Sequence, residues 1–413
     1  MHAEEDRREN SRTRGALPWR ATLSAFCASL VGIGLARFAY TPLLPAIISA
    51  HWFAASAGAY LGAANLAGYL AGALLGRSLA ARFAAPLILR LMMTLATAAF
   101  LACAHPVSFL WFFVWRFIAG LSGGALMVLA APTVLPLVPA ARRGFAGGLI
   151  FMGVGAGIAA SGTLVPILLR QGLTEAWIGL GILSCLLTLA AWNGWPEHTP
   201  TPAAQAHPRP TATLRALYLE YALNAVGLVP HMIFLVDFIA RGLGQGLQIG
   251  ADYWVLFGLG AMAGPLLSGH LGDRIGFGPA LRLAYLLEAG AVVLPALHLG
   301  AWSLILSSLV VGAFTPGIVP LVLGRVRELL PHHPEAQKAA WSAATASFAI
   351  LQVGAAYGMS FIFAQSSGDY RVLFVIGAGA MLLALALDLV AAIVASGPRH
   401  RMKKSREECE STP

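Results

Sequence analysis

About twelve apolar stretches of roughly 20 residues each follow one another along this chain, separated by short polar breaks. A stretch of that length crosses the hydrocarbon core of a bilayer as a helix. The pattern therefore predicts an all-α membrane protein with about 12 transmembrane helices. The predicted helices cover residues 21–49, 54–76, 85–104, 108–137, 145–170, 175–194, 214–240, 250–272, 279–299, 302–324, 338–365 and 370–395.

Lysine and arginine mark alternate breaks between these stretches. One set of breaks carries only Arg170, Arg241 and Arg371, and two further arginines, Arg37 and Arg116, lie inside apolar stretches. All others of the 27 basic residues flank the opposite set of helix ends. Because basic residues are retained on the cytoplasmic side, we expect both chain termini to be cytoplasmic.

A polar, proline-rich segment divides the predicted helices into two sets of six. It covers residues 195–213 and is too polar to cross lipid. The expected organisation is a cytoplasmic tail (1–20), an N-terminal six-helix bundle (21–194), a cytoplasmic linker (195–213), a C-terminal six-helix bundle (214–395) and a second cytoplasmic tail (396–413).

Composition excludes several classes of protein. With 58% hydrophobic and 11% charged residues, the chain cannot cover a soluble globule of 413 residues, so its main solvent is the lipid bilayer. The net charge of +9 is spread over short clusters rather than one basic face, which argues against a nucleic-acid partner. The four cysteines form no CxxC pair, and the chain has no GxxxxGK[ST] phosphate loop. We expect no disulfide, metal site, cofactor or ATP hydrolysis.

The segment Gly269-His270-Leu271-Gly272-Asp273-Arg274-Ile275-Gly276 falls between the second and third helices of the second half. It fits the pattern GxLxDRxG and resembles the cytoplasmic loop signature of the major facilitator superfamily. Asp273 can cap a helix and pair with an arginine across the bundle interface. We expect Gly269, Asp273, Arg274 and Gly276 to form a conformational latch.

The first half carries partial copies of superfamily motifs. The copy of the loop motif at Gly76 keeps Arg82 but lacks the acidic residue. Arg116, Gly120 and Gly124 resemble the RxxxGxxxG pattern that the superfamily associates with proton coupling. The fifth helix is glycine-rich but lacks the Gly-Pro pair of the antiporter signature. Its glycines serve tight packing alone, or form a face on which one bundle rocks against the other.

The first helix contains Gly32-Ile33-Gly34-Leu35-Ala36-Arg37-Phe38-Ala39-Tyr40-Thr41-Pro42-Leu43-Leu44-Pro45. This run resembles the first-helix signature of the YbfB/YjiJ-type branch of the superfamily. The resemblance implies two pseudo-symmetric six-helix bundles, in which the first, fourth, seventh and tenth helices line a central cavity. It implies a transporter and names no solute.

Arg37 and Arg116 are costly at their depth unless something compensates their charge. No Asp or Glu occurs between Asn10 and Thr174, so neither arginine has a carboxylate partner in its own half. Three interpretations are open: bonds to backbone carbonyls, tuning of a proton site, or recognition of an anionic group.

Other intramembrane polar residues are weaker candidates for solute binding or coupling. On the seventh helix, His231 can carry a coupling proton or be simply hydrogen-bonded, and Asp237 lies near the outer end, where a gate or cap is an equal alternative. The remaining candidates are Tyr40, Asn224, Thr315 and Gln352.

These features favour a secondary transporter of a small solute that works by alternating access and is coupled to protons, with a solute that is anionic or carries an anionic group. The alternatives are a membrane-embedded transferase-type enzyme, which needs clustered reactive side chains, and a transporter-like sensor. The excess of arginine over lysine suggests a bacterial source and hence the inner membrane.

Overall fold

The computed structural model describes residues 18–139, 143–196, 211–331 and 333–396. Within these ranges, 12 helices are long and apolar enough to cross a membrane. Most of the predicted tails and most of the predicted linker lie outside the described residues. The 12 membrane-spanning helices confirm the prediction of about 12 transmembrane spans.

The first six spans contain the helices α2 to α8. The first span is interrupted, and consists of α2 (Trp19–Ser29), the π-helix η1 (Leu30–Leu35), a turn at residues 36–39, and α3 (Tyr40–Ser49). The next spans are α4 (Ala55–Arg82), α5 (Ala85–Ala102), α6 (Phe109–Val134) with the short η2 (Leu135–Leu137), α7 (Arg143–Leu169) and α8 (Leu173–Ala191).

The second six spans contain the helices α9 to α15. The seventh span is also interrupted: α9 (Ala212–Val229) is followed by the π-helix η4 (Pro230–Phe234), α10 (Leu235–Asp237) and the π-helix η5 (Phe238–Gly242). The others are α11 (Leu247–Ile275), α12 (Phe277–Leu297), α13 (Ala301–Leu329), α14 (Pro334–Gln365) and α15 (Tyr370–Ser396).

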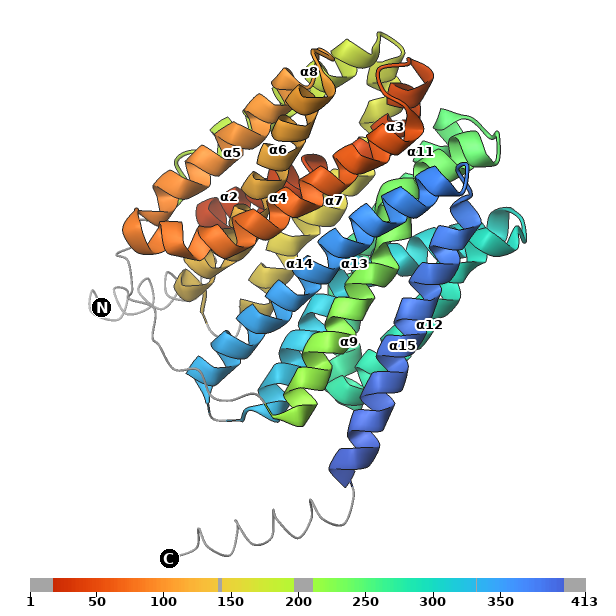
Figure 1. Cartoon of the computed structure of the whole chain (residues 1–413). Coiled ribbons are helices and arrows are strands. Elements are labelled where there is room, and N and C mark those ends of the chain that lie inside the picture. The colour runs from red at the N-terminus through yellow and green to blue at the C-terminus, as the bar shows by residue number, and fades with distance from the viewer. Residues whose placement is uncertain (1–17, 140–142, 197–210, 332, 397–413) are drawn as a thin grey trace, which may run out of the picture.

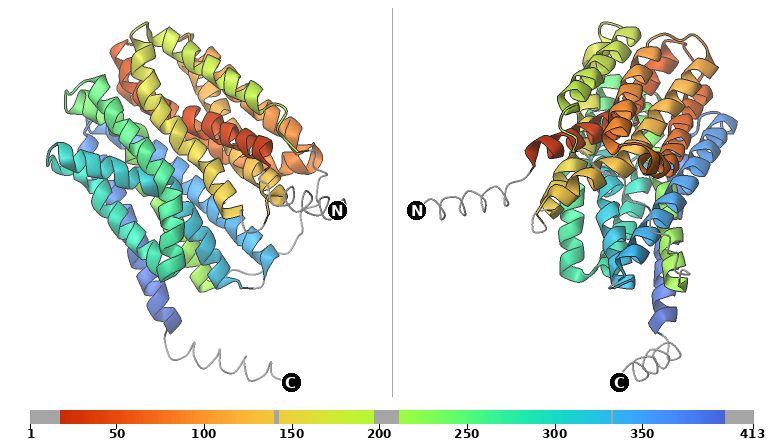
Figure 2. Two further views of the ribbon diagram at one scale, coloured as in Figure 1. Left: turned by 180° about the vertical axis from the view of Figure 1, so that it is seen from behind. Right: turned by 90° about the vertical axis from the view of Figure 1, so that its left-hand side faces the viewer.

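The spans form two bundles. Figures 1 and 2 show α2 to α8, in red to yellow, gathered on one side and α9 to α15, in green to blue, on the other. The bundles meet along two long helix pairs, α7 with α11 and α4 with α14, and along α3 with α10. Large apolar side chains such as Leu186 on α8 and Ile393 on α15 are exposed on the outside, where lipid surrounds the protein.

Several helices are longer than their apolar pattern predicted. The second span was expected to end at residue 76 but continues to Arg82, and the tenth continues from the expected 324 to Leu329. The second half of the GxLxDRxG segment, residues 273–276, was expected to lie beyond the helix, yet α11 runs to Ile275. The apolar pattern ends where the hydrocarbon ends, whereas backbone hydrogen bonding carries a helix into the polar region.

The two ends of the molecule differ in charge. Arg82, Arg90, Arg215, Arg274 and Arg325 lie at the end where α4 and α11 finish and α9 begins, which we call the arginine-rich end. The opposite, arginine-poor end is where α3 finishes and where α4 and α11 begin. The charge alternation in the sequence therefore corresponds to a real segregation in space.

Glycine spacing shows how tightly the halves pack along α7 and α11. Near the arginine-poor end, a Cβ atom at Gly162 would lie 2.9 Å from the Ala251 carbonyl oxygen. Near the middle, a Cβ at Gly155 would lie 2.5 Å from the Met262 nitrogen. A Cβ at Gly147, toward the arginine-rich end, would meet nothing within 4 Å. At the next residue, a Cβ at Gly148 would lie 3.1 Å from Leu266 Cδ2 of α11. The backbones of α7 and α11 therefore approach most closely from the middle to the arginine-poor end, and the contact nearer the arginine-rich end is made by a side chain.

Candidate functional site

Arg37 lies in the turn between η1 and α3, close to the middle of the first span. The helix is irregular here, since the backbone N–H groups of both Arg37 and Phe38 donate to the Ile33 carbonyl. Two glycines of the first-helix signature, Gly32 and Gly34, precede the turn and lie against α6 and α7. An interrupted helix inside a membrane is tolerated where protein buries it. The break places the Arg37 side chain between the two halves.

The Arg37 guanidinium contacts both halves of the protein. Its Nη2 donates to the Gln352 Oε1 on α14 at 2.8 Å and lies 3.7 Å from the Met232 sulfur on η4. Its central carbon is 4.8 Å from the centroid of the Tyr69 ring on α4. The Nε is buried and has no hydrogen-bond partner among the described residues. Gln352, a candidate from the sequence, thus joins Arg37 across the interface.

Arg116 on α6 is more deeply buried, with 2% of its surface exposed. Its Nη1 donates to the Ala36 carbonyl at 3.0 Å, and the guanidinium lies 4.3 Å from the centroid of the Tyr40 ring. Its Nε and Nη2 are buried and have no partner among the described residues. These two nitrogens share one edge of the guanidinium, the edge that grips a carboxylate or phosphate with two parallel hydrogen bonds.

Asn65 on α4 completes this cluster and was missed by the sequence reasoning. Its Nδ2 donates to the Arg116 carbonyl at 3.1 Å and to the Ala36 carbonyl at 3.4 Å. The two helices approach closely here, because a Cβ at Gly120 would lie 1.8 Å from the Asn65 carbonyl oxygen. Asn65 is a lone amide in an otherwise apolar helix, and that signal could have identified it.

Further contacts join the halves between the level of Arg37 and the arginine-poor end. The Thr41 hydroxyl donates to the Met232 carbonyl at 2.5 Å. The Trp254 indole N–H donates to Ser161 at 3.1 Å, and the Phe38 ring lies 6.0 Å from the Trp254 ring. The structure therefore has Arg37 and its neighbours closed off on the arginine-poor side.

Four of the sequence candidates lie outside this cluster. Asn224 donates to Glu288 at 2.7 Å, and His231 is hydrogen-bonded to Ser307 at 2.7 Å, both within the second half. The Thr315 hydroxyl donates to the carbonyl of Val311 in its own helix. The cluster at mid-membrane therefore brings together Arg37, Tyr40, Arg116 and Gln352 from the sequence candidates, and adds Asn65, Thr41 and Met232.

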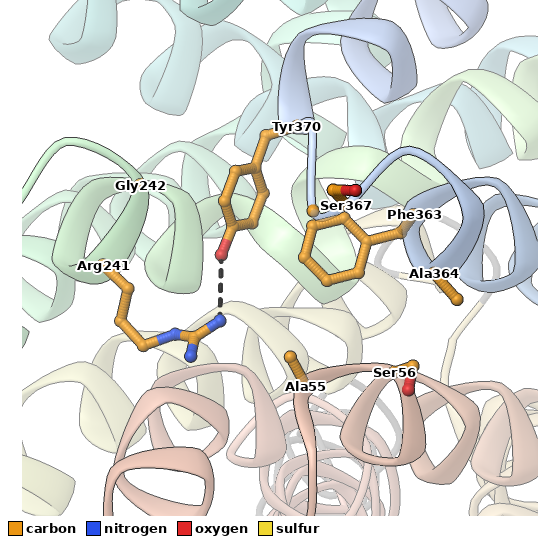
Figure 3. Close-up of a pocket in the computed structure, with 9 residues that line it drawn as sticks. Ala55, Ser56, Arg241, Gly242, Phe363, Ala364, Ser367 and Tyr370 are labelled. Atoms are coloured by element: carbon orange, nitrogen blue, oxygen red, sulfur yellow. Dashed lines mark hydrogen bonds between the residues drawn. The ribbon is translucent and has the colours of Figure 1, made fainter.

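Asp237, the fourth sequence candidate outside the mid-membrane cluster, lies at the arginine-poor end. It accepts from Arg241 Nε at 2.6 Å and from the Tyr370 hydroxyl at 2.6 Å. Arg241 and Tyr370 line a cavity of about 460 Å³ that also touches Ala55 and Ser56 of the other half. Figure 3 shows Arg241 and Tyr370 facing each other on one side of this cavity, with Ser56 opposite. Asp237 neutralises the charge of Arg241, so this cavity carries little of the positive charge found at mid-membrane.

The predicted latch residues lie at the arginine-rich end. Asp273 and Arg274 are exposed in the last turn of α11, and in the described ranges neither takes part in an ion pair. Gly276 has a φ of 83°, a left-handed conformation that favours glycine. Directly after it, the Phe277 N–H donates to Glu328, which is paired with Arg325 at 2.8 Å. Gly276 and Glu328 therefore fix the sharp entry into α12.

The fold is shared with solved transporters of the major facilitator superfamily. A D-xylose–proton symporter superposes with a TM-score of 0.70 at 16% identity, covering 90% of this chain and 97% of that one. The E. coli xylose transporter XylE, in a partially occluded inward-open conformation, gives 0.70 at 17% identity, with 89% and 96% coverage. A variant of the nucleoside transporter NupG gives 0.70 at 13% identity, with 90% and 99% coverage. These likenesses show the fold that the chain shares with them.

A narrower assignment comes from the sequence. The chain belongs to the family described as "Uncharacterised MFS-type transporter YbfB", whose profile matches residues 29–389. The first-helix resemblance is thereby confirmed. No curated protein matches the chain.

Proposed function

We propose that this protein is a proton-coupled secondary transporter of a small solute that bears an anionic group. The arginine-rich end faces the cytoplasm of a bacterial cell, as the retention of basic residues on that side predicts. The solute binds at mid-membrane between Arg37 and Arg116. The observation that carries this proposal is the edge of Arg116, where Nε and Nη2 are both buried and have no partner in the described part of the chain.

Backbone carbonyls supply only part of what the two arginines need. The Ala36 carbonyl accepts one hydrogen bond from Arg116, and Arg37 has one neutral partner, Gln352. Three N–H-bearing nitrogens of the pair remain buried and find no partner among the residues that the structure describes. Leaving a buried charged donor unpaired costs roughly 1–3 kcal/mol or more. A carboxylate or phosphate on these edges offsets that cost, whereas a neutral hydroxyl offsets less of it.

Four carboxylates of the second half have partners within that half. Asp237 pairs with Arg241, Asp388 with Arg282, and Glu328 with Arg325. Glu288 accepts from Asn224. In the described part of the chain, neither Arg37 nor Arg116 belongs to an ion pair. The counter-charge expected from the sequence is therefore best supplied by the transported solute.

Gln352 links solute binding to alternating access. Its Oε1 occupies Nη2 of Arg37, which is one of the two nitrogens on the edge that a carboxylate would use. Because this bond joins the two halves, an anion that takes both nitrogens must replace Gln352 and release that contact. In the empty carrier, Arg37 bonds to Gln352 across the interface. In the loaded carrier, Arg37 bonds to the solute instead.

Proton coupling follows from the charge that such a solute carries. Moving one elementary charge against the membrane potential costs about 2.3 kcal/mol per 100 mV, and a co-transported proton cancels that charge. Glu220 on α9 is 2% exposed and has one carboxyl oxygen without a partner among the described residues. It is, with His231, a candidate to carry the proton. One solved transporter with the same fold is described as a D-xylose–proton symporter.

The test is solute flux in proteoliposomes with and without a pH gradient. Small carboxylates and phosphates are compared with neutral analogues of the same carbon skeleton. We expect the anions to be carried and the pH gradient to drive them. Arg116→Ala should abolish anion uptake, whereas Arg371→Ala, which removes an exposed arginine at the arginine-poor end, should leave it unchanged. Transport of neutral or cationic solutes only, with normal flux through Arg37→Ala and Arg116→Ala, would refute the proposal.

A further inference from the structure

A second group of arginines lies on the outer surface of the first half, at the arginine-rich end. Here α8 ends at Ala191 and Trp192 between the start of α2 and the start of α5. Arg90 of α5 donates from Nε to the Trp192 carbonyl at 2.8 Å, and its guanidinium lies 5.5 Å from the centroid of the Trp192 ring. Arg90 is thereby held against the end of α8.

Arg20, in the first turn of α2, lies beside the same end of α8. Its carbonyl would lie 2.6 Å from a Cβ at Gly194, so the first turn of α2 touches the chain just after Trp192. The Ser24 hydroxyl, one turn further along α2, donates to the Ala191 carbonyl at 3.0 Å. Arg20 is exposed, and Arg20 and Arg90 therefore flank the same helix end.

No carboxylate in the described ranges pairs with the arginines at this place, and Glu197, five residues after Trp192, lies outside those ranges. The first half has no Asp or Glu from residue 11 to residue 174, and Glu175 lies at the other end of α8. Among the described residues, Nη1 and Nη2 of Arg90 and the whole guanidinium of Arg20 make no hydrogen bond to protein. The Nε–H of Arg90 caps the carbonyl end of α8. The remaining donors of Arg90 and those of Arg20 are left for an external anion.

The surface below these arginines is apolar and faces lipid. On α8, Leu186, Leu189 and Trp192 follow one another at intervals of three residues and are 60%, 62% and 39% exposed. On α2, Trp19 and Leu23 are 59% and 53% exposed. Tryptophan at such a position marks the level of the lipid headgroups. Cationic groups at headgroup level above a leucine stripe match a molecule with an anionic head and an acyl chain.

From this juxtaposition we propose that Arg20, Arg90 and Trp192 form a binding site for one anionic phospholipid. The phosphate group accepts hydrogen bonds from the free nitrogens of Arg90 and from Arg20. The acyl chain lies along Leu186 and Leu189. A zwitterionic phospholipid fits less well, because its ammonium group would be held among two arginines. This site is separate from the mid-membrane cluster and does not depend on the proposed solute.

The test measures binding of short-chain phosphatidylglycerol to the purified full-length protein in neutral detergent, by native mass spectrometry and by the shift in thermal unfolding. Each basic residue near a membrane surface contributes on the order of fivefold in affinity for anionic lipid. Arg20→Gln alone leaves the Arg90 bond to α8 intact and should weaken binding about fivefold. Arg20→Gln with Arg90→Gln should weaken it roughly 30-fold.

Two controls separate this site from general surface charge. Arg170→Gln with Arg371→Gln removes the same charge from the arginine-poor end and should leave binding within about twofold, since these residues lie outside the site. Short-chain phosphatidylcholine and inorganic phosphate should both bind far more weakly than phosphatidylglycerol. Equal losses in both double variants, equal binding of phosphatidylcholine, or equal binding of inorganic phosphate would each overturn the proposal.

Discussion

At the residue scale, the two buried arginines differ in how much of the guanidinium is free. Arg116 keeps one whole edge unpaired, whereas Arg37 shares the equivalent edge with Gln352. An anion therefore binds Arg116 without competition and binds Arg37 only by displacing a protein group. Arg116 is expected to contribute mainly to affinity, and Arg37 to the link between binding and movement.

Arg116→Lys keeps the positive charge but replaces a planar fork by a point charge. We expect solute binding to weaken by roughly 10- to 100-fold, since one charge-assisted hydrogen bond contributes about 1.5–3 kcal/mol. Binding is measured by calorimetry on the purified protein with the solute identified in the flux screen. Equal affinity for the wild type and Arg116→Lys would show that the fork is not used.

Gln352→Ala removes the competitor for Arg37 Nη2 and one contact between the halves. We expect tighter solute binding, by roughly three- to tenfold, because a neutral hydrogen bond contributes about 0.5–1.5 kcal/mol. Transport should nevertheless slow, since the empty carrier loses a contact that closes it. Gln352→Glu is the opposing variant: its carboxylate pairs with Arg37 and should abolish anion binding. Unchanged affinity in both variants would contradict the competition.

The residue types of the central cluster were predictable from the sequence, but their partners were not. Arg37 and Arg116 stood out because a buried cation without a local carboxylate is rare. Asn224 and His231 were equally polar, yet they bind Glu288 and Ser307 inside the second half. Which face of a helix points into the interface depends on packing between helices distant in sequence. The chemical type of a residue therefore does not predict which helix face it lies on or which partner it binds.

At the element scale, the interruption of the first span was not predicted, whereas Pro230 predicts a kink beside His231 in the seventh span. The apolar pattern is continuous through η1 and η4, so it predicts one helix in each case. The local signals were Gly32 and Gly34 before the first break and Pro230 at the start of η4. Both breaks place a residue of the interface, Arg37 or Met232, at mid-membrane. Such π segments often occur at functional sites.

The contact between α4 and α6 gives a prediction at this scale. Gly120→Ala would place a Cβ 1.8 Å from the Asn65 carbonyl oxygen and force the two backbones apart. We expect a loss of about 1–3 kcal/mol or more in stability, together with displacement of Arg116 and Asn65. Thermal unfolding in detergent measures the loss.

Gly290→Ala is the matched control, because a Cβ there meets nothing within 4 Å. It should leave the unfolding temperature unchanged or raise it slightly, since alanine is the better helix former. Equal stability of Gly120→Ala and the wild type would mean that α4 and α6 do not pack as closely as the structure has them.

At the scale of the whole molecule, the structure corresponds to one state of an alternating cycle. The halves are joined by Arg37 and Gln352, by Thr41 and Met232, and by Trp254 and Ser161, on the arginine-poor side of the centre. Nearer the arginine-rich end, a Cβ at Gly147 would meet nothing within 4 Å, and one at Gly148 would meet only the Leu266 side chain of α11. If that end is cytoplasmic, this is an inward-facing state. A latch that closes the cytoplasmic side should then be open, and the exposure of Asp273 agrees with that expectation.

Asp273→Asn tests the latch without touching the solute site. In the opposite state, Asp273 is expected to pair with an arginine across the interface, and an exposed pair contributes up to about 1 kcal/mol. Its loss should shift the populations of the two states by up to roughly fivefold toward the one described here. We expect slower transport with solute affinity unchanged within a few-fold. Spin-label distances across the arginine-rich end measure the shift, and flux assays measure the rate. Asp252→Asn, an exposed carboxylate near the opposite end of α11, is the control and should alter neither. A collapse of affinity with unchanged distances would place Asp273 in solute binding and remove it from the latch.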